Sequence, residues 1–410
     1  MDRRALLRSA GAAALAALGG TRGFAAGAVP EEKVEMPFAN GERPLVRYPG
    51  KRPLIQLTAR PPQLETPFAV FDEGPLTPND AFFVRYHLSG IPLSIDPDAF
   101  RLTVQGEVER PLSLSLSDLG QGFEPCEIVA VNQCSGNSRG LFESRVAGGQ
   151  LGHGAMGNAR WRGVTLKSVL DAAGVKPGGR QVTFRGLDRP ALAETPVFEK
   201  ALDIDHARDG EVMLAWSMNG EDLPWLNGYP LRLVVPGHYG TYWVKHLNEI
   251  TVIPDAFEGY WMAKAYRVPD NHCGCVAPGN VPPRTVPIGR LNVRSLFTNA
   301  IDGAEIEAGR PEVLRGVAFD GGYGVTDVLV STDSGLSWRA AKLGADLGRY
   351  SFRPWSIEVA LPPGAHELKA RAINRIGETQ PMTALWNPSG YRYNAVETLR
   401  LVARAEGARR

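Results

Sequence analysis

Cys134 stands where a strongly apolar run of the sequence gives way to a turn of small and polar residues. The run, Cys126–Cys134 (CEIVAVNQC), is typical of a strand buried on both faces. The turn that follows, Ser135–Arg139 (SGNSR), ends in an arginine. A cysteine at the end of a buried strand is held rigidly and can face a cleft, where its thiolate is available for chemistry. A buried structural cysteine is the alternative interpretation, because free cysteine also behaves as a small hydrophobic residue.

The other cysteines and two missing motifs limit the chemistry further. Besides Cys134 the chain contains Cys126, Cys273 and Cys275, and four cysteines in 410 residues are too few for a disulfide scaffold. The segment His272–Cys275 (HCGC) offers three metal donors, but its glycine- and proline-rich surroundings favour a surface loop near a partner interface. The sequence has no Cys-x-x-Cys-His and no His-Glu-x-x-His motif. It therefore lacks the signatures of c-type haem attachment and of common zinc proteases.

The elements that must position Cys134 belong to a globular protein of ordinary composition. Of the 410 residues, 43% are hydrophobic and 22% are charged, which excludes a disordered chain, a coiled coil and a protein with many membrane spans. The 45 Lys and Arg residues balance 44 Asp and Glu residues, and a formal net charge of +1 argues against nucleic-acid binding. The 46 glycines and 32 prolines predict many turns and short strands.

Residues 1–28 are predicted to be a cleaved export signal rather than part of the fold. Arg3 and Arg4 lie in a charged start, an apolar run follows as far as Gly20, and small residues occupy positions 25–28. The apolar run is shorter than the ~20 residues that span a bilayer, so we expect no membrane span after cleavage. The arginine pair resembles a twin-arginine signal, which exports folded proteins to the periplasm. An ordinary secretory signal is the alternative.

The rest of the chain divides into three predicted parts. Residues 29–80 are rich in proline and arginine and weakly periodic, and we expect an extended N-terminal arm. Residues 81–280 mix strands, such as 100–105, with a short amphipathic helix at Leu166–Ala173, which indicates an α+β domain. Across residues 285–405, short β runs alternate with turns and no helix interrupts them. This pattern predicts an all-β immunoglobulin-like sandwich.

Further motifs lie on both sides of Cys134 in a fixed order. In chain order they are FVRYH at 83–87, QCSGNSR at 133–139, GAMGNARW at 154–161, NGYPLR at 227–232, VPGH at 235–238, WVK at 243–245 and AYRVPDN at 265–271. Each motif is weak alone, but together they resemble the sulfite oxidase family of molybdenum enzymes, and above all its exported bacterial sulfite dehydrogenases. The resemblance extends over residues 67–403 and includes the sandwich, which is the dimerisation domain of that family.

The resemblance implies the chemistry of the site. Cys134 matches the protein ligand of molybdenum, a metal that here prefers thiolate donors beside the two sulfurs of a pyranopterin dithiolene. The family's substrate-pocket positions are matched by Arg85, His87, Arg139 and Tyr266. Their guanidinium, imidazole and hydroxyl groups suit a small oxyanion such as sulfite. The positions that contact the molybdopterin cofactor are matched by Phe83, Arg85, His87, Cys134, Asp188, Asn227, Arg232, Trp243, Val244 and Lys245.

Three features differ from the animal members of that family. Asn227 stands where those enzymes have histidine, a change shared with bacterial relatives. The segment Gly149–Gly152 lacks the tryptophan that they place after the cysteine loop, which affects one wall of the pocket. The sequence before Ala81 leaves no room for their haem-carrying cytochrome b5 domain. We therefore expect no haem on this chain and a separate c-type cytochrome as the electron acceptor.

The function predicted from the sequence is oxidation of sulfite to sulfate by an exported, homodimeric molybdenum enzyme. One alternative is an oxygen-atom reductase of the same superfamily that acts on sulfoxide or nitrate. Another, from a different class of protein, is a secreted binding or adhesion protein built on the sandwich. Metal content distinguishes the last from the others, because a binding module has no reason to hold molybdenum in stoichiometric amounts.

Overall fold

The computed structural model describes residues 32–405. The predicted export signal, residues 1–28, lies outside the described residues and stays a prediction. Within the described range, no helix is long and apolar enough to cross a membrane.

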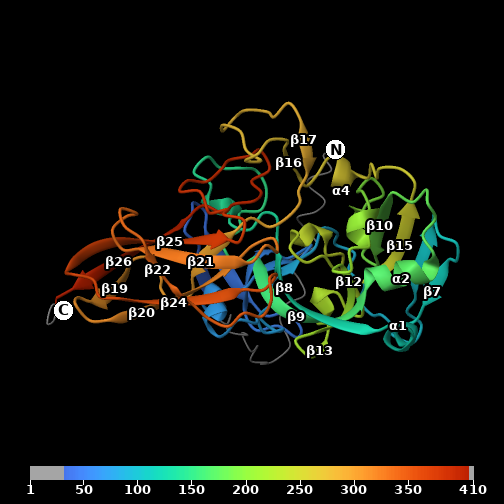
Figure 1. Ribbon diagram of the computed structural model, residues 1–410, viewed down its shortest axis with the longest axis horizontal. Coiled ribbons are helices and arrows are strands. Elements are labelled where there is room, and N and C mark those ends of the chain that lie inside the picture. Colours follow the sequence, from blue (N-terminus) through green and yellow to red (C-terminus); the bar gives the residue numbers. More distant parts are fainter. Residues whose placement is uncertain (1–31, 406–410) are drawn as a thin grey trace, which may run out of the picture. The chain divides into compact units, whose positions relative to one another are not determined.

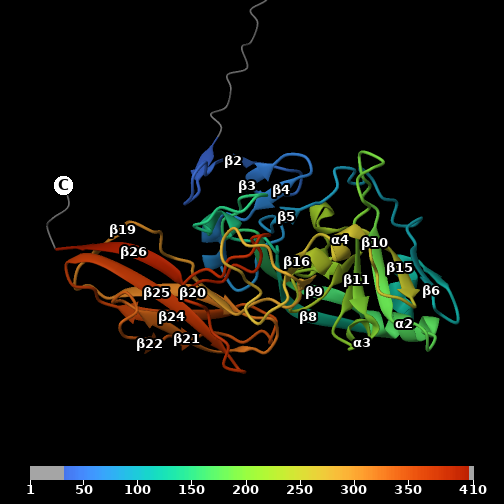
Figure 2. The same cartoon turned by 90° about the horizontal axis from the view of Figure 1, so that it is seen from above.

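The first part of the described chain is a five-stranded antiparallel sheet that ends at the candidate site. Its strands lie in the order β1 to β5, with bounds Lys33–Glu35, Glu42–Val46, Leu54–Thr58, Gln63–Glu65 and Val84–Arg85. Figure 2 shows β2 to β5 beside one another. Four segments of the stretch expected to form an extended arm, residues 33–35, 42–46, 54–58 and 63–65, thus belong to a sheet. The reason is packing: Leu54 of β3, Leu64 of β4, and Val84 and Tyr86 in and after β5 form a small core that an unpaired arm would leave exposed.

A second sheet leads to Cys134. Its strand order is β13-β12-β9-β8, with β14 also paired to β12, and the bounds are Glu221–Asp222, Met213–Met218, Met156–Thr165, Pro125–Gln133 and Arg232–Val234. Strand β8 is the apolar run expected to be buried on both faces. Residues Val129–Gln133 are buried, whereas Pro125–Ile128 alternate between exposed and half-buried. The expectation therefore holds for the half of the strand that precedes the cysteine.

A third sheet has the order β11-β10-β15-β6-β7, in which β6 runs parallel to β15. The strand bounds are Glu199–Asp203, Gln181–Gly186, Leu247–Ile253, Leu102–Gly106 and Leu112–Leu114. The α-helices of this region are α1 (Leu116–Gly122), α2 (Leu166–Ala173), α3 (Ile204–Ala207) and α4 (Tyr260–Ala263). Short 3-10 turns lie at η1 (Phe68–Asp72), η2 (Arg139–Leu141), η3 (Trp225–Asn227) and η4 (Gly240–Tyr242). The mixture confirms the α+β class predicted for this part of the chain.

Helix α2 joins the second and third sheets. The Thr165 hydroxyl accepts a hydrogen bond from the backbone N–H of Ser168 (3.2 Å), which caps the first turn. Gly174, at φ +71°, ends the helix in the left-handed conformation that glycine adopts without strain. The buried face of α2 packs against β6, β9 and β12. The helix therefore joins both sheets into one hydrophobic core, which includes Cys134.

The C-terminal part is an all-β sandwich, as predicted. One sheet has the order β18-β20-β24-β23, with bounds Arg294–Phe297, Glu312–Phe319, Arg353–Val359 and Lys342–Leu343. The other has the order β19-β26-β25-β21-β22, with bounds Ala304–Glu307, Glu397–Arg404, Gly364–Asn374, Val325–Ser331 and Arg339–Ala340. Figure 1 shows these strands in orange and red. A small hairpin, β16 (Arg267–Pro269) and β17 (Thr285–Pro287), precedes the sandwich.

Candidate active site

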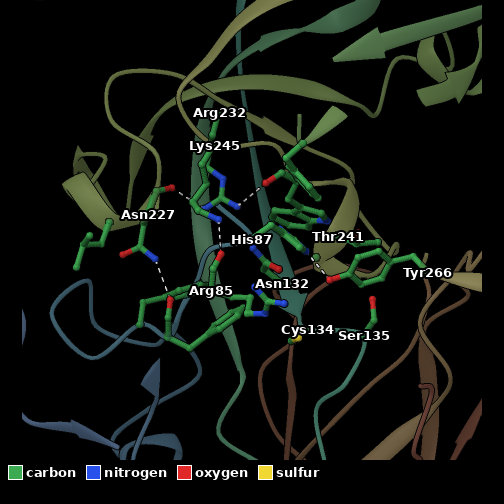
Figure 3. A pocket seen from close by; sticks show the side chains of 16 residues that line it. Arg85, His87, Asn132, Cys134, Ser135, Asn227, Arg232, Thr241, Lys245 and Tyr266 are labelled. Atoms are coloured by element: carbon green, nitrogen blue, oxygen red, sulfur yellow. Dashed lines mark hydrogen bonds between the residues drawn. The ribbon is translucent and has the colours of Figure 1, made fainter. Parts of the chain in front are cut away.

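A pocket opens where β8 ends. Figure 3 shows that its labelled side chains point into a common space from segments far apart in the sequence. Its lining consists of Phe82, Phe83, Arg85, His87, Asn132, Cys134, Ser135, Phe198, Leu226, Asn227, Arg232, Gly240, Thr241, Trp243, Lys245 and Tyr266. The first sheet supplies Arg85, which lies on its last strand, β5. The pairing of β5 with β4 places Arg85 opposite Gln63 and so fixes its backbone. The fold thus brings the separate sequence motifs to one place.

The backbone around Cys134 is fixed by hydrogen bonds. The Cys134 N–H donates to the carbonyl of Ala155 (2.9 Å), and the Cys134 carbonyl accepts from the N–H of Asn137 (3.0 Å). The Asn137 side-chain oxygen in turn accepts from the N–H of Ala155 (3.0 Å). Ser138 closes the turn at φ +69°. Cys134 is 8% exposed and lines the pocket, so a rigid turn presents its thiol to this space.

His87 and Tyr266 form a hydrogen-bonded pair in the pocket wall, between the His87 Nε2 and the phenolic oxygen. The His87 ring also stacks on Phe198, with centroids 3.9 Å apart. Burial, and after it the positive charges of Arg85 and Lys245, hold the pKa of His87 well below its ordinary value. Burial likewise raises the pKa of Tyr266 well above its ordinary value. Near neutral pH the pair is therefore a neutral imidazole beside an intact phenol.

The opposite part of the pocket is strongly cationic. Arg232 is fully buried, donates to the Asn227 carbonyl (2.8 Å), and lies over the rings of Trp161 and Trp243. Burial lowers the pKa of Arg232 to about 9. Burial, followed by the charge of Arg232, lowers the pKa of Lys245 to about 7. A bound anion would hold both side chains in their charged forms, so this end suits a phosphate group.

Four buried polar atoms of the pocket lining have no hydrogen-bond partner in residues 32–405. They are Asn132 Oδ1, Ser135 Oγ, Arg232 Nε and Thr241 Oγ1. Leaving such an atom unsatisfied costs about 1–3 kcal/mol, so a cluster of them in one pocket indicates a polar ligand. Gly240 keeps this wall open, because a Cβ there would lie 2.3 Å from Asn132 Oδ1. The polar atoms, the cations and the Cys134 thiol together fit a phosphate-bearing pterin cofactor with a thiolate-bound metal.

Nine of the residues expected at the site line this pocket: Phe83, Arg85, His87, Cys134, Asn227, Arg232, Trp243, Lys245 and Tyr266. Arg139, Asp188 and Val244 are not among the lining residues. Asp188 is buried, and the Lys245 charge counteracts the rise in its carboxyl pKa that burial causes. Arg139 donates from Nε to the Ser389 carbonyl (3.1 Å) and from Nη1 to the Gly149 carbonyl (3.3 Å). The roles assigned to these twelve residues stay predictions.

Asn132, Ser135, Thr241 and Lys51 were not predicted as site residues from the sequence. Asn132 lies two residues before Cys134, Ser135 directly follows it, and Thr241 lies between two recognised motifs, so position along the chain was the available signal. No signal in the sequence indicated Lys51, because it belongs to the segment expected to be an arm. Its ammonium donates to the carbonyls of Asn79 (2.6 Å) and Phe82 (3.0 Å) and to the side-chain oxygen of Asn227 (2.6 Å). Lys51, in the loop between β2 and β3, therefore holds Asn227, a residue predicted to contact the cofactor.

The buried ammonium of Lys51 makes stability depend on pH. Burial lowers its pKa from 10.5 to about 7, although the charge of Asp80 raises it. Between these values the unfolded chain binds more protons than the folded one, so stability rises with pH over this window. We expect wild type to gain up to about 1.4 kcal/mol per pH unit relative to Lys51→Met above pH 7. Denaturant unfolding of both proteins from pH 6 to pH 9.5 measures this, and parallel pH profiles would contradict it.

Two segments near Cys134 match short patterns of unrelated enzyme classes. GNSRG at 136–140 has the serine-hydrolase pattern, and Ser138 Oγ lies 2.8 Å from His153 Nδ1. Ser138 is fully buried, however, and its hydroxyl also accepts from Arg294 Nη2 (2.7 Å). GHGAMG at 152–157 has the dinucleotide pattern but leads into β9 rather than a helix. Both segments therefore support the turn after Cys134 instead of forming sites of their own.

Cys273 and Cys275 form a disulfide. Among residues 32–405, no group of three or more His, Cys, Asp or Glu side chains is arranged to hold a metal ion. The His272–Cys275 segment contains exposed and half-buried residues, with Gly274 buried. It is therefore a crosslinked loop rather than a metal site, and the free cysteines of the described chain are Cys126 and Cys134.

Comparisons with known proteins agree with this geometry. Residues 87–261 match the family model of the oxidoreductase molybdopterin binding domain, and residues 285–396 match that of the Mo-co oxidoreductase dimerisation domain. Mitochondrial sulfite oxidase of Homo sapiens is 34% identical over 89% of this chain and 69% of its own. Sulfite oxidase of Gallus gallus is 36% identical over 86% of this chain and 78% of its own. A nitrate reductase [NAD(P)H] of Hordeum vulgare is 30% identical over 85% of this chain and 41% of its own.

Among solved structures, the sulfane dehydrogenase SoxCD from Paracoccus pantotrophus has the same fold. The TM-score is 0.71, with 24% identity over 94% of this chain and 93% of that one. Fold and pocket define an oxidoreductase that carries a molybdenum–molybdopterin cofactor. The chain belongs to the sulfite oxidase family of molybdenum enzymes.

Proposed function

We propose that this protein oxidises sulfite to sulfate. Sulfite and water give sulfate, two protons and two electrons. The observation that carries the proposal is the pocket itself, in which Cys134 shares one small space with Arg85, His87 and Tyr266. The two relatives reported above as sulfite oxidases, each more than 30% identical to this chain, support it. The cofactor, when bound, supplies the two-electron redox chemistry and a transferable oxygen.

The side chains of the pocket have separate tasks in this reaction. Arg85 provides a positive charge with planar donors, which binds a small oxyanion better than a point charge does. The phenol of Tyr266 keeps its proton near neutral pH and can donate a hydrogen bond to a substrate oxygen. The neutral His87, hydrogen-bonded to that phenol, fixes its orientation. Phe82, Phe83 and Phe198 exclude water from part of the wall, which strengthens each polar contact.

We propose further that the electrons leave one at a time to a separate c-type cytochrome, and that the enzyme works in the periplasm as a homodimer. The arginine pair at Arg3-Arg4 supports export, and the match of residues 285–396 to a dimerisation domain supports the dimer. A cytochrome suits that compartment as a one-electron acceptor. Encounters between redox proteins are typically small and steered by complementary charge.

Sulfite-dependent reduction of an acceptor tests the proposal. We expect the purified protein to contain molybdenum in stoichiometric amounts and to reduce both ferricyanide and a c-type cytochrome when sulfite is added. The rate with the cytochrome should fall as salt screens the encounter. Oxidation of a reduced dye by nitrate or a sulfoxide, without any sulfite oxidation, would instead identify a reductase. A protein without molybdenum would be a binding module.

A further inference from the structure

A loop of the C-terminal part of the chain, residues 386–392, reaches the turn that follows Cys134. The backbone N–H of Arg392 donates to the carbonyl of Ser135 (3.2 Å). The loop is rigid at this point, because the side chain of Asn387 binds the backbone of Tyr391 twice. Its Nδ2 donates to the Tyr391 carbonyl (2.8 Å), and its Oδ1 accepts from the Tyr391 N–H (3.2 Å). Tyr391 is therefore held at a fixed place beside the pocket.

The ring of Tyr391 contacts two residues expected to handle the substrate. It stacks on Tyr266, with centroids 5.3 Å apart and ring planes 5° from parallel. The guanidinium carbon of Arg139 lies 5.2 Å from the centroid of the same ring. Offset stacking and cation–π contact are both favourable arrangements of an aromatic ring. Tyr391 thus connects Arg139, which is not among the lining residues, to Tyr266, which is.

Glycines restrict Arg139 to this position. A Cβ at Gly136 would lie 2.8 Å from Arg139 Nη2, and one at Gly148 would lie 3.0 Å from Nη1. A Cβ at Gly390 would lie 2.8 Å from Arg139 Cγ. The side chain therefore fills a slot whose walls tolerate no larger residue. With Nε and Nη1 bound to the Ser389 and Gly149 carbonyls, the face of the guanidinium depends on Tyr391 for support.

The electrostatics agree with such a role. Burial raises the pKa of the Tyr391 phenol, and the charges of Arg139 and Arg85 oppose that rise. Both arginines are thus within electrostatic reach of the phenol. An intact phenol offers an uncharged, electron-rich face to the guanidinium over the whole working pH range.

We propose that Tyr391 is a positioning residue of the substrate pocket, which seats Tyr266 and Arg139 for binding of the anionic substrate. The inference rests on the proposed oxidation of sulfite. The C-terminal part of the chain, which matches a dimerisation domain, would then also take part in substrate binding. The ring acts through its two neighbours rather than by touching the substrate, so its loss should affect binding more than turnover.

Three variants test this inference: Tyr391→Leu, Tyr391→Phe and Tyr393→Leu. Tyr393 is the matched control: it is half-buried just beyond this loop and also faces an arginine, but its ring packs edge-on against Phe142 (5.1 Å) and lies under Arg294 (5.7 Å) rather than Arg139. With ferricyanide as acceptor, Tyr391→Leu should raise the KM for sulfite about tenfold while kcat changes less than about threefold. Tyr391→Phe keeps the ring and should stay within about twofold of wild type, as should Tyr393→Leu. All three should retain the wild-type molybdenum content.

Each other outcome has a distinct meaning. If wild type oxidises sulfite and Tyr391→Leu keeps the wild-type KM, the inference is wrong and the proposed function stands. A rise in KM of equal size in Tyr393→Leu would show a general effect of the loop and would also overturn it. So would an equal rise in Tyr391→Phe, because the hydroxyl rather than the ring would then be responsible. Molybdenum-loaded wild type that does not oxidise sulfite would overturn the proposed function itself.

Discussion

Cys134→Ser is expected to lose more than about a hundredfold in sulfite oxidation while the protein stays folded and keeps the pterin. The change replaces a soft thiolate by a hard hydroxyl that remains protonated, so the predicted protein ligand of molybdenum is lost. The cations Arg232 and Lys245 lie elsewhere in the pocket lining and are unchanged, so pterin binding should persist. Steady-state assays, together with metal and pterin analysis of the purified variant, measure both effects.

Cys126→Ser is the matched control, because Cys126 is the second residue of β8, the strand that leads to Cys134, and is the other free cysteine of residues 32–405. It is half-buried and lies outside the pocket lining, and burial raises the pKa of its thiol. Its replacement should leave turnover near wild type and cost some stability through the less favourable burial of a hydroxyl. Near-normal sulfite oxidation by Cys134→Ser would show that the ligand assignment is wrong.

The parts of the fold that the sequence predicted well are those with local, repeated signals. Helix α2 has both a capping threonine and a terminating glycine in the sequence, and its predicted bounds are those observed. The sandwich strands alternate with turns, as predicted for residues 285–405, and β21 (Val325–Ser331) is one of them. Strand β8 was recognised from its apolar content. Periodicity could not show that its first half is exposed, since that depends on which neighbours cover it.

The N-terminal sheet was missed because its evidence is not local. Strands of three to five residues carry little periodicity, and these become strands only by pairing with each other and with β5. Lys51 was missed for the same reason. Its acceptors come from Asn79, Phe82 and Asn227, and Asn227 is 176 residues away in the chain.

The candidate site depended on a resemblance rather than on spacing. Cys134 was singled out from the end of its strand, but Arg85, Arg232 and Tyr266 are ordinary residue types whose importance comes from convergence in space. Tyr391 had no signal at all, since nothing in residues 386–392 predicts that this loop reaches the turn after Cys134. Contacts of that kind arise from the docking of the sandwich segment, which no local pattern reports.

Arg232→Gln should produce a folded protein that contains less than about a tenth of the wild-type molybdenum and pterin. Arg232 is buried among Trp161 and Trp243 with its Nε unpartnered in the described part of the chain, and burial lowers its pKa to about 9. Such a buried guanidinium lacks an anion to compensate its charge. Losing hydrogen bonds between charged groups costs roughly 1.5–3 kcal/mol each, enough for a tenfold or larger loss of cofactor.

The cofactor-free form of Arg232→Gln should be at least as stable as cofactor-free wild type, because an uncompensated buried charge has been removed. Arg160→Gln is the control: Arg160 lies on β9, pairs with Glu127 at 2.7 Å, and is 43% exposed at its side chain. Its replacement should change neither cofactor content nor stability by much. Metal analysis and thermal unfolding of both variants decide the matter, since full molybdenum content in Arg232→Gln would mean that the phosphate-binding role lies with other residues.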